Sequence, residues 1–260
     1  MKKHRWFATL AAMVMALAVA GCSDGSSGNE FATGSSGGSG NSSGSGVDNP
    51  VSQQPDYSKC AVGDFILKDG TILSKDETPD SGTVAAVIVR AAADGKPALG
   101  VGIVHSKSGL EWCDSKAAGY YKTITDLQGD TKTGYMDGSD GWEKLKAACS
   151  DAESHPNWDY PAWNYSLTYA EKNSLTRDLA EDWYLPTVAE LYPIYQNKTT
   201  VDESLSKAGG SQFGTSYYWS CCQLPSYSSG AWVLSFGNGG MGNTDKDNKY
   251  NYVCSVRAFN

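Results

Sequence analysis

"DWYLPTVAELYPIYQNKTTVDESLSKAGGSQFGTSYYWSCCQ", residues 182–223, holds the clearest local signals in this 260-residue chain. The segments TVAE (187–190) and TVDE (200–203) both match T-x-x-E, the capping-box pattern that begins a helix. Gly209-Gly210 is a typical helix stop. The aromatic residues that follow are typical of a strand. This stretch therefore predicts two short helices and then a strand.

Strand patterns flank this stretch on both sides. Toward the C-terminus, "AWVLSF" (231–236) and "YNYVCSVRAF" (250–259) are rich in aromatic and β-branched residues. Toward the N-terminus, "TVAAVIVR" (83–90) and "ALGVGIVH" (98–105) are joined by an Asp-Gly pair, which is a strong hairpin signal. The following "SGLEWC" (108–113) is expected to continue that sheet.

"GDFIL" (63–67) predicts the first strand. Apolar residues with helical spacing occupy the middle of the chain, because "GWEKLKAACSDAE" (141–153) and "PAWNYSLTYAEKN" (161–173) place them three and four positions apart. Periodicity alone therefore predicts a mixture of α and β structure.

Four separated blocks carry a family resemblance. In order, they are "WYLPTVAELY", "GGSQFGTSYYWSCCQ", "AWVLSFGNG" and "YVCSVRAF". They resemble the family of the C-terminal domain of the Legionella collagen-like adhesin, at least over residues 182–259. "VGDFILKDGT" and "GVGIVHSKSGLEWC" are similar to the front half of spirochaete lipoproteins of the same group.

The resemblance implies a fold and a kind of function. The implied fold is an α+β, C-type-lectin-like domain with a mixed, mainly antiparallel sheet, a few short helices, and pairing between the first and last strands. Some relatives are variable proteins of diversity-generating retroelements, in which the C-terminal segment is diversified and displayed for ligand binding. We therefore expect a ligand-binding or adhesin-like protein.

The N-terminus predicts export and a lipid anchor. Lys2, Lys3 and Arg5 precede an apolar run that ends in Val19-Ala20-Gly21-Cys22. Residues 1–21 are therefore interpreted as a signal peptide. The small residues before the cysteine resemble a bacterial lipobox, which implies cleavage before Cys22 and lipidation of its sulfur. A secreted protein with a chance cysteine is the alternative.

A tether is expected to follow the anchor. Residues 22–56 hold the lipidated cysteine and a Gly/Ser-rich stretch that cannot bury apolar surface, so disorder is predicted. Residues 57–260 remain for one ligand-binding domain. The expected location is the bacterial cell envelope, anchored by lipid in the outer membrane and exposed at the cell surface.

Charge and cysteine usage exclude some partners. The net charge is −8, and losing the three signal-peptide cations makes the mature chain more negative, so nucleic acid is not an expected partner. Besides Cys22, six cysteines remain, with fifteen possible pairings. Adjacent Cys221 and Cys222 are expected on opposite faces of a strand, which leaves free thiols. A zinc site is not expected, because no C-x-x-C pair or Cys/His cluster is present.

The glycine-rich "GNGGMG" (237–242) matches the dinucleotide pattern G-x-G-x-x-G. That chemistry needs a helix directly after the glycines. The following "NTDKDNKYN" has no apolar helical stripe, so the glycines are interpreted as a turn between two strands and no cofactor is expected.

The next residues imitate the start of a calcium loop. Asn243, Asp245 and Asp247 alternate as the first ligands of an EF-hand do, but the sixth position is Asn248 and the twelfth is Cys254, where glycine and glutamate are needed. An EF-hand is excluded and no metal is assigned. A weaker loop site that combines Asp245, Asp247 and a distant carboxylate stays an alternative.

No catalytic constellation is evident, so we expect a protein that is not an enzyme. His105 and His155 are the histidines of the mature chain, and neither has a partner motif. The family is similar in fold to formylglycine-generating oxidases, which leaves an oxidase as one alternative. Cys221 and Cys222 are adjacent and not spaced for that copper chemistry. A structural envelope lipoprotein without a dedicated ligand is the other alternative.

The C-terminal segment has the composition of an adaptable contact surface. Tyrosine supplies rigid amphipathic area, while Ser, Gly and Asn adjust hydrogen bonds. The predicted framework is Trp219, Trp232, Phe236, Val256 and an internally paired Arg257. The predicted ligand-binding face, for a protein or a glycan, comprises Gln223, Tyr227, Ser228, Asn238, Met241, Asn243, Asp245, Asp247, Asn248, Tyr250 and Asn251.

Overall fold

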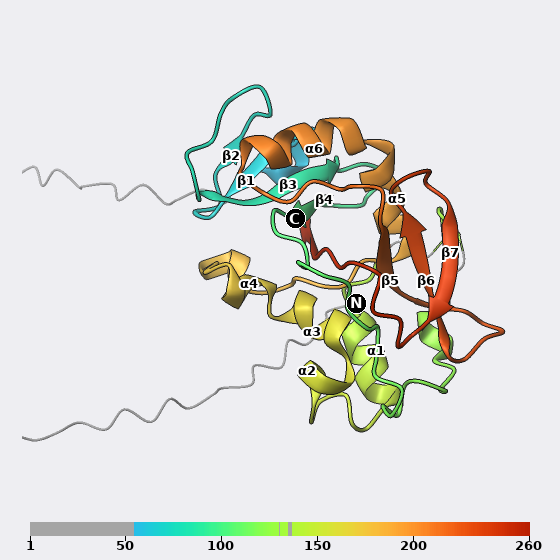
Figure 1. The fold of residues 1–260 in the computed structure, drawn as a ribbon. Helices are drawn as coiled ribbons and strands as arrows, with labels where there is room; N and C mark the ends of the chain where they lie inside the picture. The colour runs from blue at the N-terminus through green and yellow to red at the C-terminus, as the bar shows by residue number, and fades with distance from the viewer. Residues whose placement is uncertain (1–54, 130, 135–136) are drawn as a thin grey trace, which may run out of the picture. The chain divides into compact units, whose positions relative to one another are not determined.

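Strand β3 is the centre of the larger of two sheets. The computed structural model describes residues 55–129, 131–134 and 137–260. Neighbouring strands of this sheet are antiparallel throughout. In spatial order they are β2 (Ile72–Leu73), β1 (Phe65–Leu67), β3 (Val84–Arg90), β4 (Ala98–Gly102) and β8 (Val256–Phe259) (Figure 1).

Short helices make up most of the remaining regular structure. The α-helices are α1 (Gly141–Ala148), α2 (Pro156–Asp159), α3 (Pro161–Leu167), α4 (Tyr169–Lys172), α5 (Val188–Gln196) and α6 (Lys198–Lys207). The 3-10 helices are η1 (Tyr57–Lys59), η2 (Thr125–Leu127) and η3 (Arg177–Ala180). The predicted helical segments therefore form helices in part: in 141–153 only Gly141–Ala148 is helical, and 161–173 is divided between α3 and α4.

Helices cover both faces of β3, which explains its unbroken apolar sequence. Val87 and Val89 pack with buried side chains of α5 and α6. Ala86 and Ile88 lie in a separate cluster with side chains of α4 and η3. A strand buried on both faces has no position for an alternating polar residue.

The predicted hairpin between β3 and β4 is confirmed. Asp94 and Gly95 have φ angles of 53° and 72°, so both occupy the left-handed region that a type I′ turn requires. Ala93 and Lys96 bridge the strands beside this turn.

The smaller sheet contains the C-terminal strands. Its antiparallel order is β5 (Tyr217–Gln223), β6 (Gly230–Ser235) and β7 (Met241–Asp245). The glycine-rich segment forms the turn between β6 and β7, as predicted. Helix α5 packs against β3 of the larger sheet and against β5 and β6 of the smaller one. The chain is therefore an α+β fold with two antiparallel sheets and short helices.

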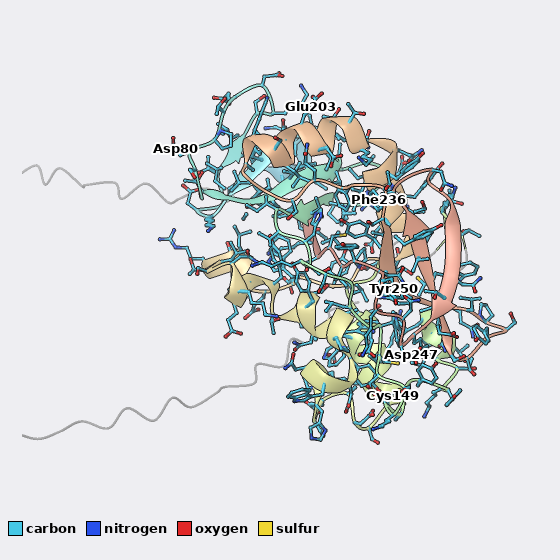
Figure 2. All side chains as sticks on the ribbon, viewed as in Figure 1. Asp80, Cys149, Glu203, Phe236, Asp247 and Tyr250 are labelled. Atoms are coloured by element: carbon cyan, nitrogen blue, oxygen red, sulfur yellow. The ribbon has the colours of Figure 1, made fainter. Side chains whose placement is uncertain are left out.

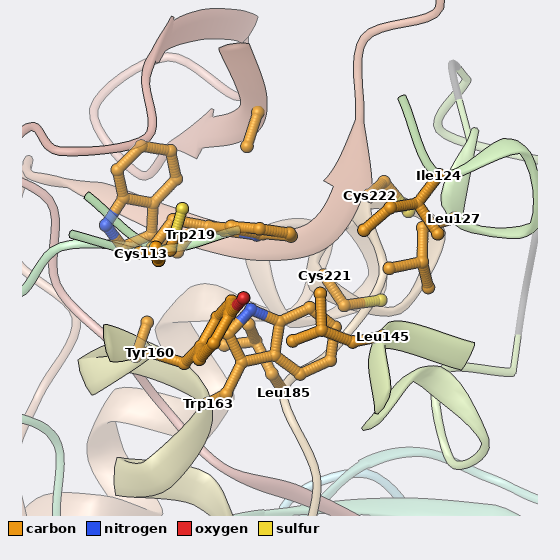
Figure 3. Close-up of a cluster of buried hydrophobic side chains, with 14 of the residues drawn as sticks. Cys113, Ile124, Leu127, Leu145, Tyr160, Trp163, Leu185, Trp219, Cys221 and Cys222 are labelled. Carbon is orange, nitrogen blue, oxygen red and sulfur yellow. The ribbon is translucent and has the colours of Figure 1, made fainter. Parts of the chain in front are cut away.

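Tryptophans dominate the core beside the smaller sheet (Figure 3). Trp112, Trp163 and Trp219 are buried in one cluster. The rings of Trp112 and Trp163 meet edge to face, with centroids 5.2 Å apart. The indole N–H of Trp112 donates to the Ser220 carbonyl at 3.0 Å, and that of Trp219 donates to the Leu110 carbonyl. The rings of Trp112 and Trp219 thus bury apolar area while their indole N–H groups keep hydrogen-bond acceptors.

Two predictions about strand pairing are wrong. Residues 108–113 form no strand, because Leu110 donates its N–H to the carbonyl of Asn251, and Trp112 to that of Lys246. These bonds hold the segment along the C-terminal loop instead of the sheet. The last strand β8 pairs with β4 and not with the first strand β1.

The capping predictions have mixed outcomes. Thr187 and Glu190 form a reciprocal capping box at the start of α5, as predicted. The second box is wrong, because Asn197 precedes α6 directly and Thr200 lies inside that helix. Gly209 ends α6 in the left-handed region, with φ 70°, as the glycine pair indicates.

The six cysteines of the described chain are buried and free. The placement of Cys221 and Cys222 on opposite faces of the strand stays a prediction, and the register of β5 is irregular between Trp219 and Gln223. The neighbouring Cys222 thiol and burial raise the pKa of the Cys221 thiol well above its usual range.

The predicted signal peptide and Cys22 lie outside the described residues. Within the described part of the chain, none of the helices combines the length and apolar character that crossing a membrane requires. The described residues, from Pro55 to Asn260, belong to one compact unit.

Glu190 is a buried carboxyl group that fixes the start of α5. It accepts hydrogen bonds from the Tyr184 hydroxyl at 2.7 Å, the Thr187 N–H at 2.9 Å and the Gly138 N–H at 3.2 Å. Burial raises its pKa from 4.5 to about 7. The capping box therefore also ties the segment before α1 to the start of α5.

This raised pKa predicts a pH-dependent stability. Folding favours the protonated form, so the stabilisation is complete below pH 4.5 and is lost as pH rises through about 7. Relative to Glu190→Gln, which cannot ionise, the parent should lose roughly 3 kcal/mol of unfolding free energy across this range. Urea denaturation at several pH values measures the difference. Parallel pH profiles for the two proteins would contradict the prediction.

Candidate binding surface

Three exposed tyrosines mark the surface near the end of β7. Tyr121, Tyr227 and Tyr250 have 74%, 44% and 84% of their surface exposed. They come from three loops: one before η2, one between β5 and β6, and one after β7. We call these three side chains the tyrosine face. Figure 2 labels Tyr250 and Asp247 in the last of these loops.

Asp245 and Asp247 form hydrogen bonds to the loop between β5 and β6 and to the loop before η2. The Tyr227 hydroxyl donates to Asp245 at 2.5 Å. The Tyr120 hydroxyl, next to exposed Tyr121, donates to Asp247 at 3.1 Å. Burial and this hydrogen bond raise the pKa of Tyr120. Loops that are distant in sequence are therefore joined around the end of β7.

Lys246 lies between these aspartates and is completely buried. Its ammonium group donates to the carbonyls of Gly119, Tyr120 and Lys122 at 2.5, 3.2 and 3.3 Å. The ammonium nitrogen is also 4.8 Å from the centre of the Trp112 ring. Burial lowers its pKa to about 8. At neutral pH the group remains protonated, and its three protons match three carbonyl acceptors.

Most of the predicted contact residues are accessible in the structure. The positions that are exposed or half-buried are Tyr227, Ser228, Asn238, Met241, Asn243, Asp245, Asp247, Asn248 and Tyr250. Asn238 lies in the turn at the other end of β7. Asn248 organises the last loop, because its side-chain oxygen accepts from the Tyr250 N–H at 2.8 Å.

Gln223 and Asn251 are buried, so their side chains do not belong to the exposed surface. The amide nitrogen of Gln223 donates to the carbonyls of Lys122 and Ser228 at 2.6 and 2.8 Å. Its amide oxygen accepts from the Ile124 N–H at 2.7 Å. Gln223 thus holds the loop that carries Tyr121.

The framework residues have the expected positions, with one exception. Trp219, Phe236 and Val256 are buried, whereas Trp232 is half-buried. Arg257 is paired internally, because its guanidinium donates to the carbonyls of Asp178 and Glu181.

Sequence reasoning missed the contribution of the loop before η2. Tyr120, Tyr121 and Lys246 were not among the predicted site residues. The adjacent tyrosines are visible in the sequence, but their place beside the C-terminal loop depends on contacts across more than 120 positions. A buried lysine also has no local sequence signature.

The two histidines lie in different environments. His105 is buried, its ring nitrogen is 3.1 Å from the Tyr218 hydroxyl, and burial lowers its pKa to about 3. His155 is exposed, with a ring nitrogen 3.8 Å from Asp159. Among the described residues, no three His, Cys, Asp or Glu side chains gather as a metal site requires. The tyrosine face offers aromatic area and hydrogen bonds, which suit non-covalent contact.

The chain belongs to the Lcl C-terminal domain family, whose sequence model matches residues 102–257, more than half of its length. This match confirms the family indicated by the sequence blocks. A search of curated proteins gives no match.

A solved structure is similar in fold. It is a fimbrial protein from Bacteroides ovatus, with 14% sequence identity and a TM-score of 0.57. The match covers 77% of this chain but only 49% of the fimbrial protein. The chain therefore spans about half the length of that relative.

Replacing Lys246 by methionine should loosen the loop before η2. Methionine keeps apolar bulk but leaves three carbonyls without their donor, so we expect a loss on the order of 1–3 kcal/mol in unfolding free energy. Amide exchange in the segment up to η2 should accelerate. Lys249→Met is the matched control, because Lys249 is largely exposed and forms a surface ion pair with Glu111. Unchanged exchange in Lys246→Met would refute the anchoring role.

Proposed function

We propose that this protein is a surface adhesin-like protein that binds a protein or glycan ligand non-covalently through the tyrosine face and the adjoining β7. The observation that carries the proposal is the set of three exposed tyrosines on loops that hydrogen bonds to Asp245, Lys246 and Asn248 hold in place. Solvent-exposed aromatic side chains on an ordered frame give contact area at low entropic cost.

The relatives support the same proposal. The family is that of the C-terminal domain of a collagen-like adhesin, and the similar solved structure is titled a fimbrial protein. The resemblance adds a C-type-lectin-like fold and retroelement-diversified residues in the C-terminal segment to this proposal. Non-covalent recognition, without cofactor or metal, is the role proposed here, so the protein acts as a binder and not as an enzyme.

The proposed location combines the anchor with display. Lipid on Cys22 would hold the protein in the outer membrane, and the Gly/Ser-rich segment would extend the binding domain from the cell surface. A coil of this composition and length has a root-mean-square reach of roughly 30 Å. The tyrosine face would then be available to partners outside the cell.

The binding role predicts a loss of capture without a loss of stability. Tyr121→Ala combined with Tyr250→Ala should weaken capture of immobilised collagen, fibronectin, laminin or mucin glycans by about tenfold or more. Stability should stay within about 0.5 kcal/mol, because both side chains are exposed. Surface plasmon resonance and thermal denaturation measure the two effects.

Trp158→Ala provides the matched control for this variant. Trp158 is 75% exposed but belongs to α2, which Figure 1 places away from β7. Capture that is weakened equally by Trp158→Ala, or a parent that captures none of these molecules, would count against the proposal.

The anchor predicts a change in partitioning. Cys22→Ser removes the sulfur that would carry the lipid. The variant should leave the detergent phase of a Triton X-114 separation or retain its signal peptide, and mass spectrometry of the mature N-terminus distinguishes the two results. Unchanged partitioning of Cys22→Ser would refute the lipobox interpretation.

A further inference from the structure

Strand β7 is the outer strand of the smaller sheet, and one of its edges is open. Its order in the sheet is β5-β6-β7, so β6 occupies one side of β7. Figure 1 shows β7 at the outer side of this sheet. Asn243 and Asp245 are exposed, and Met241 is half-buried.

The register shows which backbone groups face away from β6. The backbone N–H of Lys246 donates to the Ser229 carbonyl, and that of Ser235 donates to the Gly240 carbonyl. Lys246 with Ser229, and Gly240 with Ser235, are therefore residue pairs of the hydrogen-bonded type. Hydrogen-bonded and non-hydrogen-bonded pairs alternate in an antiparallel ladder. Thr244 and Gly242 therefore bond to β6, while Met241, Asn243 and Asp245 direct their backbone groups outward.

These outward groups form a regular row. Within the described residues, the bond from the Asn248 N–H to the Asp245 carbonyl is the one backbone bond on this edge. The N–H groups of Met241, Asn243 and Asp245 thus remain at a two-residue spacing, which an extended chain repeats. A glycan has no such repeat of alternating donors and acceptors.

Strand β7 has little of the usual protection of an edge. Natural edges are blocked by short strand length, charged side chains, proline, bulges or a covering segment. The one charged side chain of β7 is Asp245, at its end. The sequence Met-Gly-Asn-Thr-Asp contains no proline and no lysine, and its pairing with β6 is continuous. The three outward residues are the same Met241, Asn243 and Asp245 that the sequence places in the binding face.

We propose that β7 binds an extended polypeptide segment of the ligand by strand addition. This inference rests on the proposed function and makes the ligand a protein. The outward backbone groups supply pairing, and the alternate side chains Asn243 and Asp245 contact the added strand. The tyrosine face lies beside the end of β7 and contacts the rest of the ligand.

Charge indicates the chemistry of the added strand. Asp245 and Asp247 lie at the end of β7, Lys246 between them is buried, and the nearby cation Lys249 is paired with Glu111. The whole chain has a net charge of −8. A neutral or basic extended segment is therefore favoured, whereas a second copy of this acidic chain is disfavoured.

The test uses a labelled nonapeptide of alternating threonine and lysine. Amide exchange measured by NMR should slow about tenfold or more at Asn243 and Asp245 when the peptide saturates the protein. Exchange at Gly242 and Thr244, which already bond to β6, should stay unchanged. This residue pattern is specific to strand addition on the outer edge.

Two controls separate pairing from charge attraction. The same peptide with N-methyl groups on its central residues keeps its charge but cannot pair, and it should bind at least about tenfold more weakly. Asn243→Pro removes one outward N–H and leaves the ladder to β6 intact, since proline is tolerated at such edge positions. This variant should weaken binding of the unmodified peptide to a similar degree.

Several results would overturn the inference. These are absent protection at Asn243 and Asp245, equal binding of the N-methylated peptide, or protection that rises with protein concentration alone, which would identify a second copy as the occupant. The two proposals can fail separately: if Tyr121→Ala with Tyr250→Ala abolishes ligand capture while Asn243→Pro retains it, the binding face stands and strand addition is wrong.

Discussion

The ammonium group of Lys246 needs hydrogen-bond acceptors inside the protein, and the arrangement of the candidate binding surface follows from that requirement. A buried charge is costly unless hydrogen bonds replace its water. Three carbonyls between Gly119 and Lys122 provide those bonds. The backbone of Lys246 also bonds to Ser229 and Trp112. One residue therefore joins the loops on both sides of β7 to the segment that replaces the expected strand at 108–113.

Glu190 has a comparable role at the start of α5. Its carboxyl group caps α5 and also accepts from Gly138 and Tyr184. Helix α5 contacts both sheets, so fixing its first turn fixes how the sheets are joined. The two buried ionisable groups act on different junctions, and each positions a polar backbone segment that apolar packing alone would leave unsatisfied.

Local signals were sufficient for the parts of the fold that depend on neighbouring residues. The Asp94-Gly95 turn, the capping box at Thr187 and the glycine stop of α6 follow from short-range backbone geometry. The errors arose where partners are distant. Strand β8 pairs with β4. The side chain of Gln223 is buried because it forms hydrogen bonds to the backbone of Lys122 and Ile124, and its polar character gave no indication of this burial. The family resemblance supplied the fold class that periodicity left open.

The same separation of local and distant contacts explains why exposed side chains between positions 243 and 250 can be replaced without loss of the fold. Along 243–247, buried Lys246 is flanked by Asp245 and Asp247, whose carboxylates hold the tyrosines of neighbouring loops. The core contacts of this segment come mainly from Lys246 and from backbone bonds, which are insensitive to side-chain identity at Asn243 or Tyr250. Residues at those two positions can therefore be exchanged at little cost to the core, which is the property that a displayed recognition surface requires.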